Sequence, residues 1–259
     1  MTARLSPAFR WYLGLVCFSI LGSLLSQLTG LDPGPVAPIA AVATLLLGFS
    51  VACRGLKLMV ILAILAIGAA SEVLGLYTGL VFGRYEYTDA WQPIFHLPGD
   101  KPFPLLLPFA WGMMAVSAYR LVSDVSSKWV RAASAAIVTA GTLPNPWMTS
   151  LAVAMGWFAF RSNIVASAYF AAGADLLMEY TMVHSLGYWR WFESGLLFVS
   201  PPHNTLGWIV VSLLAAMLIA QSPPSDLDQS REPGSVILVH LAFTLVITGV
   251  LAIPGPLGK

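Results

Sequence analysis

Two groups of carboxylic acids lie inside long apolar stretches of this sequence. Glu72 precedes the end of one apolar run, and Asp175 and Glu179 lie four residues apart in another, so a helix would place that pair on one face. Two stacked carboxyls in a low-dielectric site repel each other when both are ionised, so one is expected to keep its proton near neutral pH. The pair is therefore a candidate general acid.

Each group also has a structural interpretation. Glu72 can hold an ion pair, and Glu179 can lie at the membrane interface, which leaves only Asp175 deeply buried. Glycines recur every four residues from Gly75 to Gly83, a small-residue pattern that admits either another helix or a flat ligand. Ionisable groups are costly inside an apolar span, which makes function the default hypothesis for the acids.

The composition favours a membrane protein. Of the 259 residues, 58% are apolar and 10% are charged, whereas a soluble domain has about 25% charged residues. The net charge is +1 and the basic residues are scattered, which argues against a nucleic-acid partner. Cys17 and Cys53 lie in apolar runs without metal-ligand spacing, so we expect neither a disulfide framework nor a metal site.

The elements that must position the acids are transmembrane helices. A bilayer core of about 30 Å needs roughly 20 apolar residues in a helix. The sequence predicts an all-α, polytopic transmembrane helical bundle, a single integral membrane domain over 1–259, with about seven full spans. They are 11–30, 36–53, 58–80, 103–122, 163–183, 205–221 and 235–253.

The stretch 131–160 is apolar but interrupted by Pro144 and Pro146, so it forms either one long kinked span or a hairpin of two short helices. Early basic residues predict a cytoplasmic N-terminus in the cytoplasmic membrane, while charge leaves the side of the C-terminus open. Glu72 and Asp175 both lie near the C-terminal ends of their helices and can meet only if those ends face one side. A mechanism that uses both acids would therefore require the hairpin and put the C-terminus outside.

Aromatic and polar residues around the acids complete the candidate site. Trp189 and Trp191 follow the acid pair, and the next span opens with His203, Asn204 and Trp208. Tryptophans in membrane proteins usually form interfacial belts, and a substrate wall is the alternative. Between the third and fourth spans, Arg84 and Glu86 are expected to fix the loop through an ion pair.

Several of these motifs resemble the membrane carotenoid-biosynthesis proteins that include the carotenoid 1',2'-hydratases. The resemblance covers about residues 70–210. It rests on Glu72 followed by the glycine run and Phe-Gly-Arg-Tyr-Glu-Tyr, on Phe109 to Met114, on Asp175 with Trp-Arg-Trp, and on Asn204 to Trp208. One departure is Glu179-Tyr180, where relatives are expected to carry Asp-Pro.

The resemblance implies a carotenoid 1',2'-hydratase, a cofactor-independent hydro-lyase that adds water to the ψ-end of an acyclic carotenoid such as lycopene or a γ-carotene-like polyene. Neither a redox cofactor nor a metal is required. Asp175 or Glu179 would protonate the double bond, and Glu72, His203 or Asn204 would position the water. The expected substrate-binding residues are Tyr85, Trp111, Trp189, Trp191, His203, Asn204 and Trp208.

Two other functions remain open. The altered acid motif is compatible with a non-catalytic carotenoid-binding or structural subunit of a membrane pigment complex, which associates with other membrane subunits. A proton-coupled transporter also uses intramembrane acids, but it predicts inverted repeats, and the sequence shows none.

Overall fold

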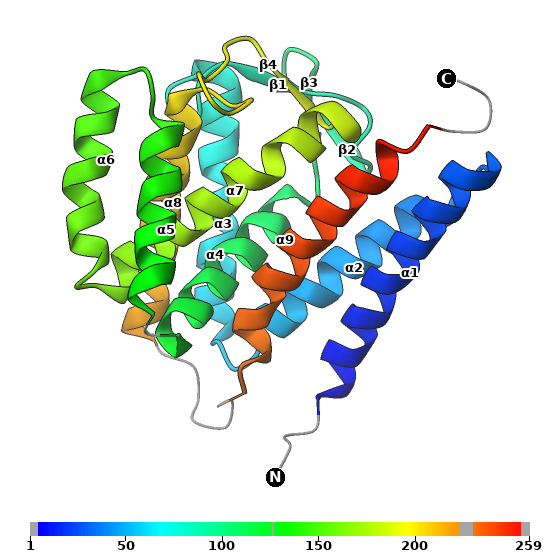
Figure 1. Ribbon diagram of the computed structural model, residues 1–259, viewed down its shortest axis with the longest axis horizontal. Helices are drawn as coiled ribbons and strands as arrows, with labels where there is room; N and C mark the ends of the chain where they lie inside the picture. Colours follow the sequence, from blue (N-terminus) through cyan, green and yellow to red (C-terminus); the bar gives the residue numbers. More distant parts are fainter. Residues whose placement is uncertain (1–4, 126, 223–229, 255–259) are drawn as a thin grey trace.

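The computed structural model describes residues 5–125, 127–222 and 230–254, and it shows a helical bundle closed at one end by short strands (Figure 1). The helices are α1 (Pro7–Thr29), α2 (Val36–Ala52), α3 (Leu58–Thr78), α4 (Leu107–Asp124), α5 (Lys128–Gly141), α6 (Pro146–Ala159), α7 (Asn163–Tyr180), the π-helical turn η1 (Thr181–Ser185), α8 (Pro202–Gln221) and α9 (Glu232–Leu251). The strands are β1 (Tyr85–Tyr87), β2 (Ile94–Leu97), β3 (Lys101–Pro104) and β4 (Trp189–Trp191).

Consecutive helices run in opposite directions (Figure 1). The ends of α3 and α7 and the starts of α4 and α8 therefore meet at one end of the bundle. The connections 79–106 and 186–201, which carry all four strands, cover this end and are called the strand cap below. β1 pairs antiparallel with β4, and β2 pairs antiparallel with β3.

The stretch 131–160 forms the hairpin that the sequence favoured, and the alternative of one long kinked span is wrong. Helix α5 ends at Gly141, and α6 begins at Pro146 with Asn145 as its N-cap, whose side chain accepts a hydrogen bond from the amide of Met148. Each arm has 14 residues, about 21 Å at 1.5 Å per residue, less than the roughly 30 Å of a bilayer core. The hairpin returns the chain to the same side before α7, so α3 and α7 run in the same direction.

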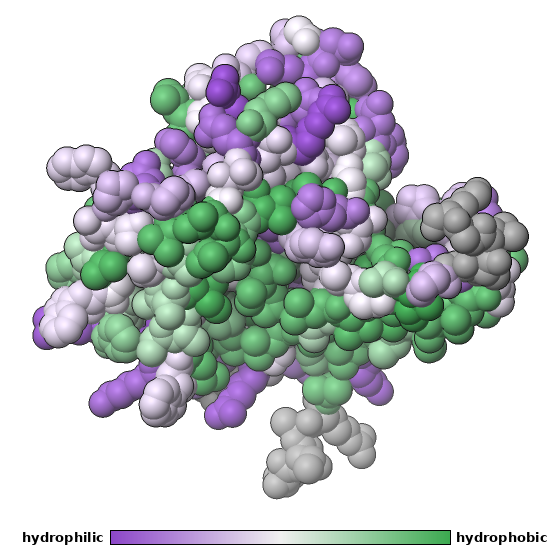
Figure 2. Space-filling model, turned by 45° about the horizontal axis from the view of Figure 1, so that its top comes forward, coloured by the Kyte–Doolittle hydropathy of each residue, from purple (hydrophilic) through white to green (hydrophobic). Residues whose placement is uncertain are grey.

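The all-α class is confirmed, but the number of about seven full spans is not. Within the described residues, four helices are long and apolar enough to cross a membrane: α1, α3, α8 and α9. Helix α2 has only 17 residues, and α4 and α7 carry more polar side chains because they lie inside the bundle. Figure 2 shows an apolar body beneath a hydrophilic end, the surface expected of a protein embedded in lipid.

Helices α4 and α7 form the centre of the bundle. Helix α7 packs against α4, α5, α6 and α8, and α4 packs against α2, α3, α7 and α9. Small side chains line α7 and let four neighbours approach its backbone. Its buried alanines are Ala166, Ala168, Ala171, Ala172 and Ala174.

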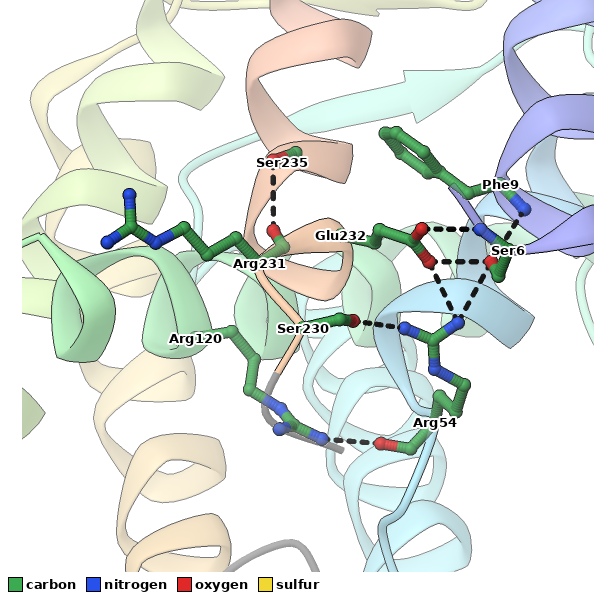
Figure 3. A network of polar contacts seen from close by, with 8 residues as sticks. All are labelled: Ser6, Phe9, Arg54, Arg120, Ser230, Arg231, Glu232 and Ser235. Atoms are coloured by element: carbon green, nitrogen blue, oxygen red, sulfur yellow. Dashed lines mark hydrogen bonds and ion pairs between the residues drawn. The ribbon is translucent and has the colours of Figure 1, made fainter. Parts of the chain in front are cut away.

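A polar network fixes the end of the bundle opposite the strand cap (Figure 3). The Glu232 carboxylate, at the start of α9, accepts hydrogen bonds from the Ser6 amide and hydroxyl at 2.6 and 2.5 Å and from Arg54 Nη1 at 2.9 Å. Arg54 also donates to Ser6 Oγ at 3.0 Å and to Ser230 Oγ, and its carbonyl accepts from Arg120 Nη2. The network therefore joins α1, α4 and α9 to the α2–α3 turn.

Candidate functional site

A cavity of about 860 Å³ lies beneath the strand cap, and all three candidate acids line it. The side chains of Glu72, Asp175 and Glu179 are buried, with exposed fractions of 5%, 6% and 2%. The structure thus brings together the residues that the sequence placed in two separate spans. The hairpin is the reason, because it makes α3 and α7 end on the same side.

Three aromatic side chains donate hydrogen bonds to Glu72. Trp111 Nε1 donates to Oε1 at 2.6 Å, and the hydroxyls of Tyr85 and Tyr87 donate to Oε2 at 2.5 and 2.9 Å. Burial, and secondly the charge of Glu72, hold the pKa of both tyrosines well above the ordinary value, so they remain protonated donors. The carboxylate of Glu72 is therefore held in one orientation.

Glu179 is held in a similar way, and Asp175 is not. Trp189 Nε1 and Trp191 Nε1 donate to Glu179 Oε2 at 3.3 and 2.9 Å. The Asn204 amide donates to both acids, to Asp175 Oδ2 at 2.8 Å and to Glu179 Oε1 at 3.1 Å. Among the described residues this is the only hydrogen bond that Asp175 accepts, which leaves its other oxygen available to a molecule in the cavity.

The alternation of the two strands explains why these donors converge. Side chains two residues apart in a strand share one face, so Tyr85 and Tyr87 of β1 both reach Glu72. Trp189 and Trp191 of β4 reach Glu179 for the same reason. The register pairs Tyr85 with Trp191 and Tyr87 with Trp189. Two short aromatic motifs thus form one wall over the acids.

The intervening charged residues point away from the acids, which corrects the expectation that Arg84 and Glu86 pair. Glu86 lies opposite Arg190 in the strand register and forms an ion pair with it. Arg84 Nε instead contacts Glu193 Oε1 at 3.0 Å. Both pairs join the two segments of the strand cap. The partners lie more than a hundred positions away in sequence, so only the β1–β4 pairing reveals them.

The remaining predicted substrate-binding residues divide between the cavity wall and the surroundings. Trp111 and Trp208 stack with ring centroids 3.5 Å apart, and Trp208 lies one helical turn after Asn204 on α8. Both tryptophans and Asn204 line the cavity. His203 is not among the lining residues, and its Cβ lies against Gly83 instead.

The glycines after Glu72 serve the strand cap. A Cβ on Gly75 would lie 3.0 Å from both the Tyr85 hydroxyl and the Phe82 ring, so its absence lets β1 fold back onto α3. Gly79 ends α3 with a φ of 66°, a conformation that favours glycine. These glycines therefore make room for residues of the strand cap, and not for another helix as the helix-packing interpretation expected.

Sequence reasoning missed two parts of the site. Tyr87 belongs to the quoted motif, and its two-residue spacing from Tyr85 signalled a shared strand face. The second part is the wall formed by α1, α2 and α9, which includes Gly22, Ser23 and Thr244. Small and polar residues inside otherwise apolar spans were the available signal.

The described residues contain no group of three or more His, Cys, Asp or Glu side chains arranged to hold a metal ion. The three acids instead face hydrogen-bond donors from aromatic rings and one amide. Chemically, such a site can hold a proton at a fixed place beside an apolar ligand.

Fold and site together define an integral membrane protein with a largely apolar cavity whose inner end is lined by buried acids. The family model described as carotenoid biosynthesis protein matches residues 34–256, and the chain belongs to this family. The resemblance inferred from the residues is therefore confirmed. No curated protein and no solved structure matches the chain.

Proposed function

We propose that this protein is a carotenoid 1',2'-hydratase, which adds water to the ψ-end double bond of an acyclic carotenoid. Membership of the carotenoid-biosynthesis family supports the substrate class. The carrying observation is the unequal hydrogen bonding of three buried acids: Glu72 and Glu179 each accept three bonds, and Asp175 accepts one. An acid that delivers a proton to a carbon atom needs an oxygen free of other hydrogen bonds, and Asp175, which lines the cavity, accepts a bond from the described residues on only one of its two oxygens.

In the proposed reaction, Asp175 is the proton donor. Its O–H bond breaks and leaves that electron pair on the carboxylate, while the π bond of the alkene breaks and its electron pair forms a C–H bond at the less substituted carbon. Water attacks the resulting tertiary cation through its oxygen and loses a proton to Glu72, from which a proton returns to Asp175. The sum is the addition of one water, with no oxidation or reduction.

Aromatic faces and negative charge would stabilise the cation. Tyr85 and Trp191 lie with ring centroids 5.1 Å apart beside the acids, and the stacked Trp111 and Trp208 form another part of the wall. A desolvated cation over such a ring gains about 2 kcal/mol. Glu179 adds a carboxylate whose position is fixed by two indoles.

The departure at Glu179-Tyr180 does not remove an acid from the site. Glu179 faces the cavity, while Tyr180 is 56% exposed and its ring lies 5.0 Å from His184. Because residue 180 is not proline, α7 continues to Tyr180 and then into η1. The motif change therefore alters how the helix ends and leaves the carboxyl in place.

The charge distribution supports an orientation with the strand cap outside. The cap holds Arg84, Lys101 and Arg190. The opposite end holds most basic residues, which favour the cytoplasmic side: Arg10, Arg54, Lys57, Arg120, Lys128, Arg131, Arg161 and Arg231. We infer a cytoplasmic N-terminus and an acid site in the outer half of the cytoplasmic membrane.

A lycopene-producing host tests the proposal when the chain is expressed in growth medium enriched in ¹⁸O water. We expect a product heavier than lycopene by one water whose oxygen carries the label. Asp175→Asn should abolish it, and the matched change of an exposed cap acid, Asp89→Asn, should not. Unchanged lycopene that copurifies with the wild-type chain would instead support a non-catalytic carotenoid-binding subunit.

A further inference from the structure

The cavity continues away from the acids into a passage between α1, α2 and α9. Its walls are mostly small or apolar residues, and we call this passage the tail arm. The residues that define it are Gly22, Ser23, Ala37, Ala41, Thr244 and Ile247. None of them belongs to the acid site, and the proposed chemistry does not use them.

The tail arm reaches the outer surface of the bundle at an apolar mouth. Phe18, Leu25, Leu31 and Val36 line the cavity and are also between 51% and 60% exposed. These residues lie on α1, on the α1–α2 turn and at the start of α2, the part that projects to the right in Figures 1 and 2. The acids at the other end of the cavity are at most 6% exposed. The cavity is therefore closed over the acids and open among lipid-facing side chains.

We propose that the tail arm holds the polyene chain of the substrate, which enters sideways from the bilayer between the α1–α2 pair and α9. The inference rests on the proposed function, since it takes the occupant to be the apolar chain attached to the reacting end. An apolar molecule dissolved in the bilayer reaches this mouth without crossing water. The arm is continuous with the acid site, so one elongated molecule can occupy both.

Gly22 lies on the wall of the tail arm. A Cβ on Gly22 would meet no atom within 4 Å, so the protein has room for a larger side chain at this position of the cavity wall. Gly14 offers a matched control on the same helix: its Cβ also meets nothing within 4 Å, and it does not line the cavity. Both glycines have α-helical surroundings in α1, so equal substitutions have similar effects on helix stability.

The test compares Gly22→Phe with Gly14→Phe in proteoliposomes that contain lycopene. We expect Gly22→Phe to lower the rate of product formation at least tenfold, and Gly14→Phe to stay within twofold of the parent. A second measurement needs no turnover: in the Asp175→Asn background, the amount of lycopene that copurifies should fall with Gly22→Phe and persist with Gly14→Phe. Circular dichroism and size-exclusion profiles check that both variants fold.

The possible failures are distinct. If both phenylalanine variants keep equal rates and equal pigment, the tail arm does not hold the polyene and a lipid acyl chain is the better occupant. The parent could instead retain lycopene and form no product. If Gly22→Phe then loses the lycopene and Gly14→Phe keeps it, the tail arm binds the polyene but the hydratase proposal is refuted.

Discussion

Asp175→Asn should abolish product formation with little change in stability, whereas Glu179→Gln should lower the stability of the protein. Both substitutions replace a buried carboxyl by its amide. In Asp175→Asn the new carbonyl oxygen can still accept the Asn204 hydrogen bond, and the new amide group faces the cavity. We therefore expect the free energy of unfolding to change by less than about 1 kcal/mol. The amide cannot deliver a proton, and loss of a general acid lowers rates by about 10²–10⁴. The barrier should thus rise by at least about 2.7 kcal/mol.

Glu179→Gln should instead destabilise the protein. The native carboxylate uses Oε2 for two indoles and Oε1 for Asn204. A glutamine has one oxygen, so its amide group must face either the Asn204 donor or both indole donors. Asn204 cannot turn to relieve the contact without losing its bond to Asp175. An unsatisfied buried donor costs about 1–3 kcal/mol, which lowers the melting temperature by roughly 2–4 °C per kcal/mol.

Thermal unfolding in nanodiscs, together with initial rates of product formation from lycopene, measures both effects on the same preparations. Asp175→Asn should be nearly as stable as the parent and inactive. The role assigned to Asp175 is refuted if Asp175→Asn keeps more than a tenth of the parent rate. The role is also refuted if Asp175→Asn unfolds at as low a temperature as Glu179→Gln. In that case Asp175 would accept more hydrogen bonds than the one assigned to it.

Three further changes probe other parts of the chain. Glu72→Leu loses three hydrogen bonds and should cost about 2 kcal/mol, at roughly 0.6 kcal/mol per bond in a membrane. Glu72→Gln should lower the free energy of unfolding by less, because a tyrosine hydroxyl can accept a hydrogen bond as well as donate one. Both variants should slow product formation. Thermal unfolding and initial rates measure the two effects. His240→Phe removes a buried Nδ1 that has no hydrogen-bond partner among the described residues, so the free energy of unfolding, measured by thermal unfolding, should rise by about 1 kcal/mol. In intact cells, Asp89→Cys should react with an impermeant thiol reagent and Lys57→Cys should not. Labelling of Lys57→Cys alone would show that the strand cap faces the cytoplasm.

The sequence predicted the meeting of the acids from helix direction combined with the mechanism that the family resemblance implied. Glu72 and Asp175 both lie near the C-terminal ends of apolar segments, so a mechanism that uses both acids required an even number of crossings over 131–160. The hairpin at Pro144 and Pro146 supplies it. The four-residue spacing of Asp175 and Glu179 likewise predicted that they share one helix face, and in the structure Asn204 donates a hydrogen bond to both.

Long-range pairing could not be read from the sequence. Arg84 and Glu86 are neighbours in the chain, but their partners come from a segment that joins them only through the β1–β4 register. The tail arm was missed for a related reason. Apolar periodicity identifies a span without telling which of its faces borders a cavity, so Gly22 looked like any other glycine of a lipid-facing helix.

The donors around the acids, more than the acids themselves, determine where reactivity can lie. Buried carboxyls are tolerated when hydrogen bonds satisfy them, and the period-two aromatic motifs of β1 and β4 provide these bonds for Glu72 and Glu179. The same strands direct Glu86 and Arg190 outward, where their ion pair holds the two segments of the strand cap together. Asp175 receives no bond from either strand. A site built from three similar acids thus acquires one member that differs from the others, because the strand cap binds two of them and leaves the third to the cavity.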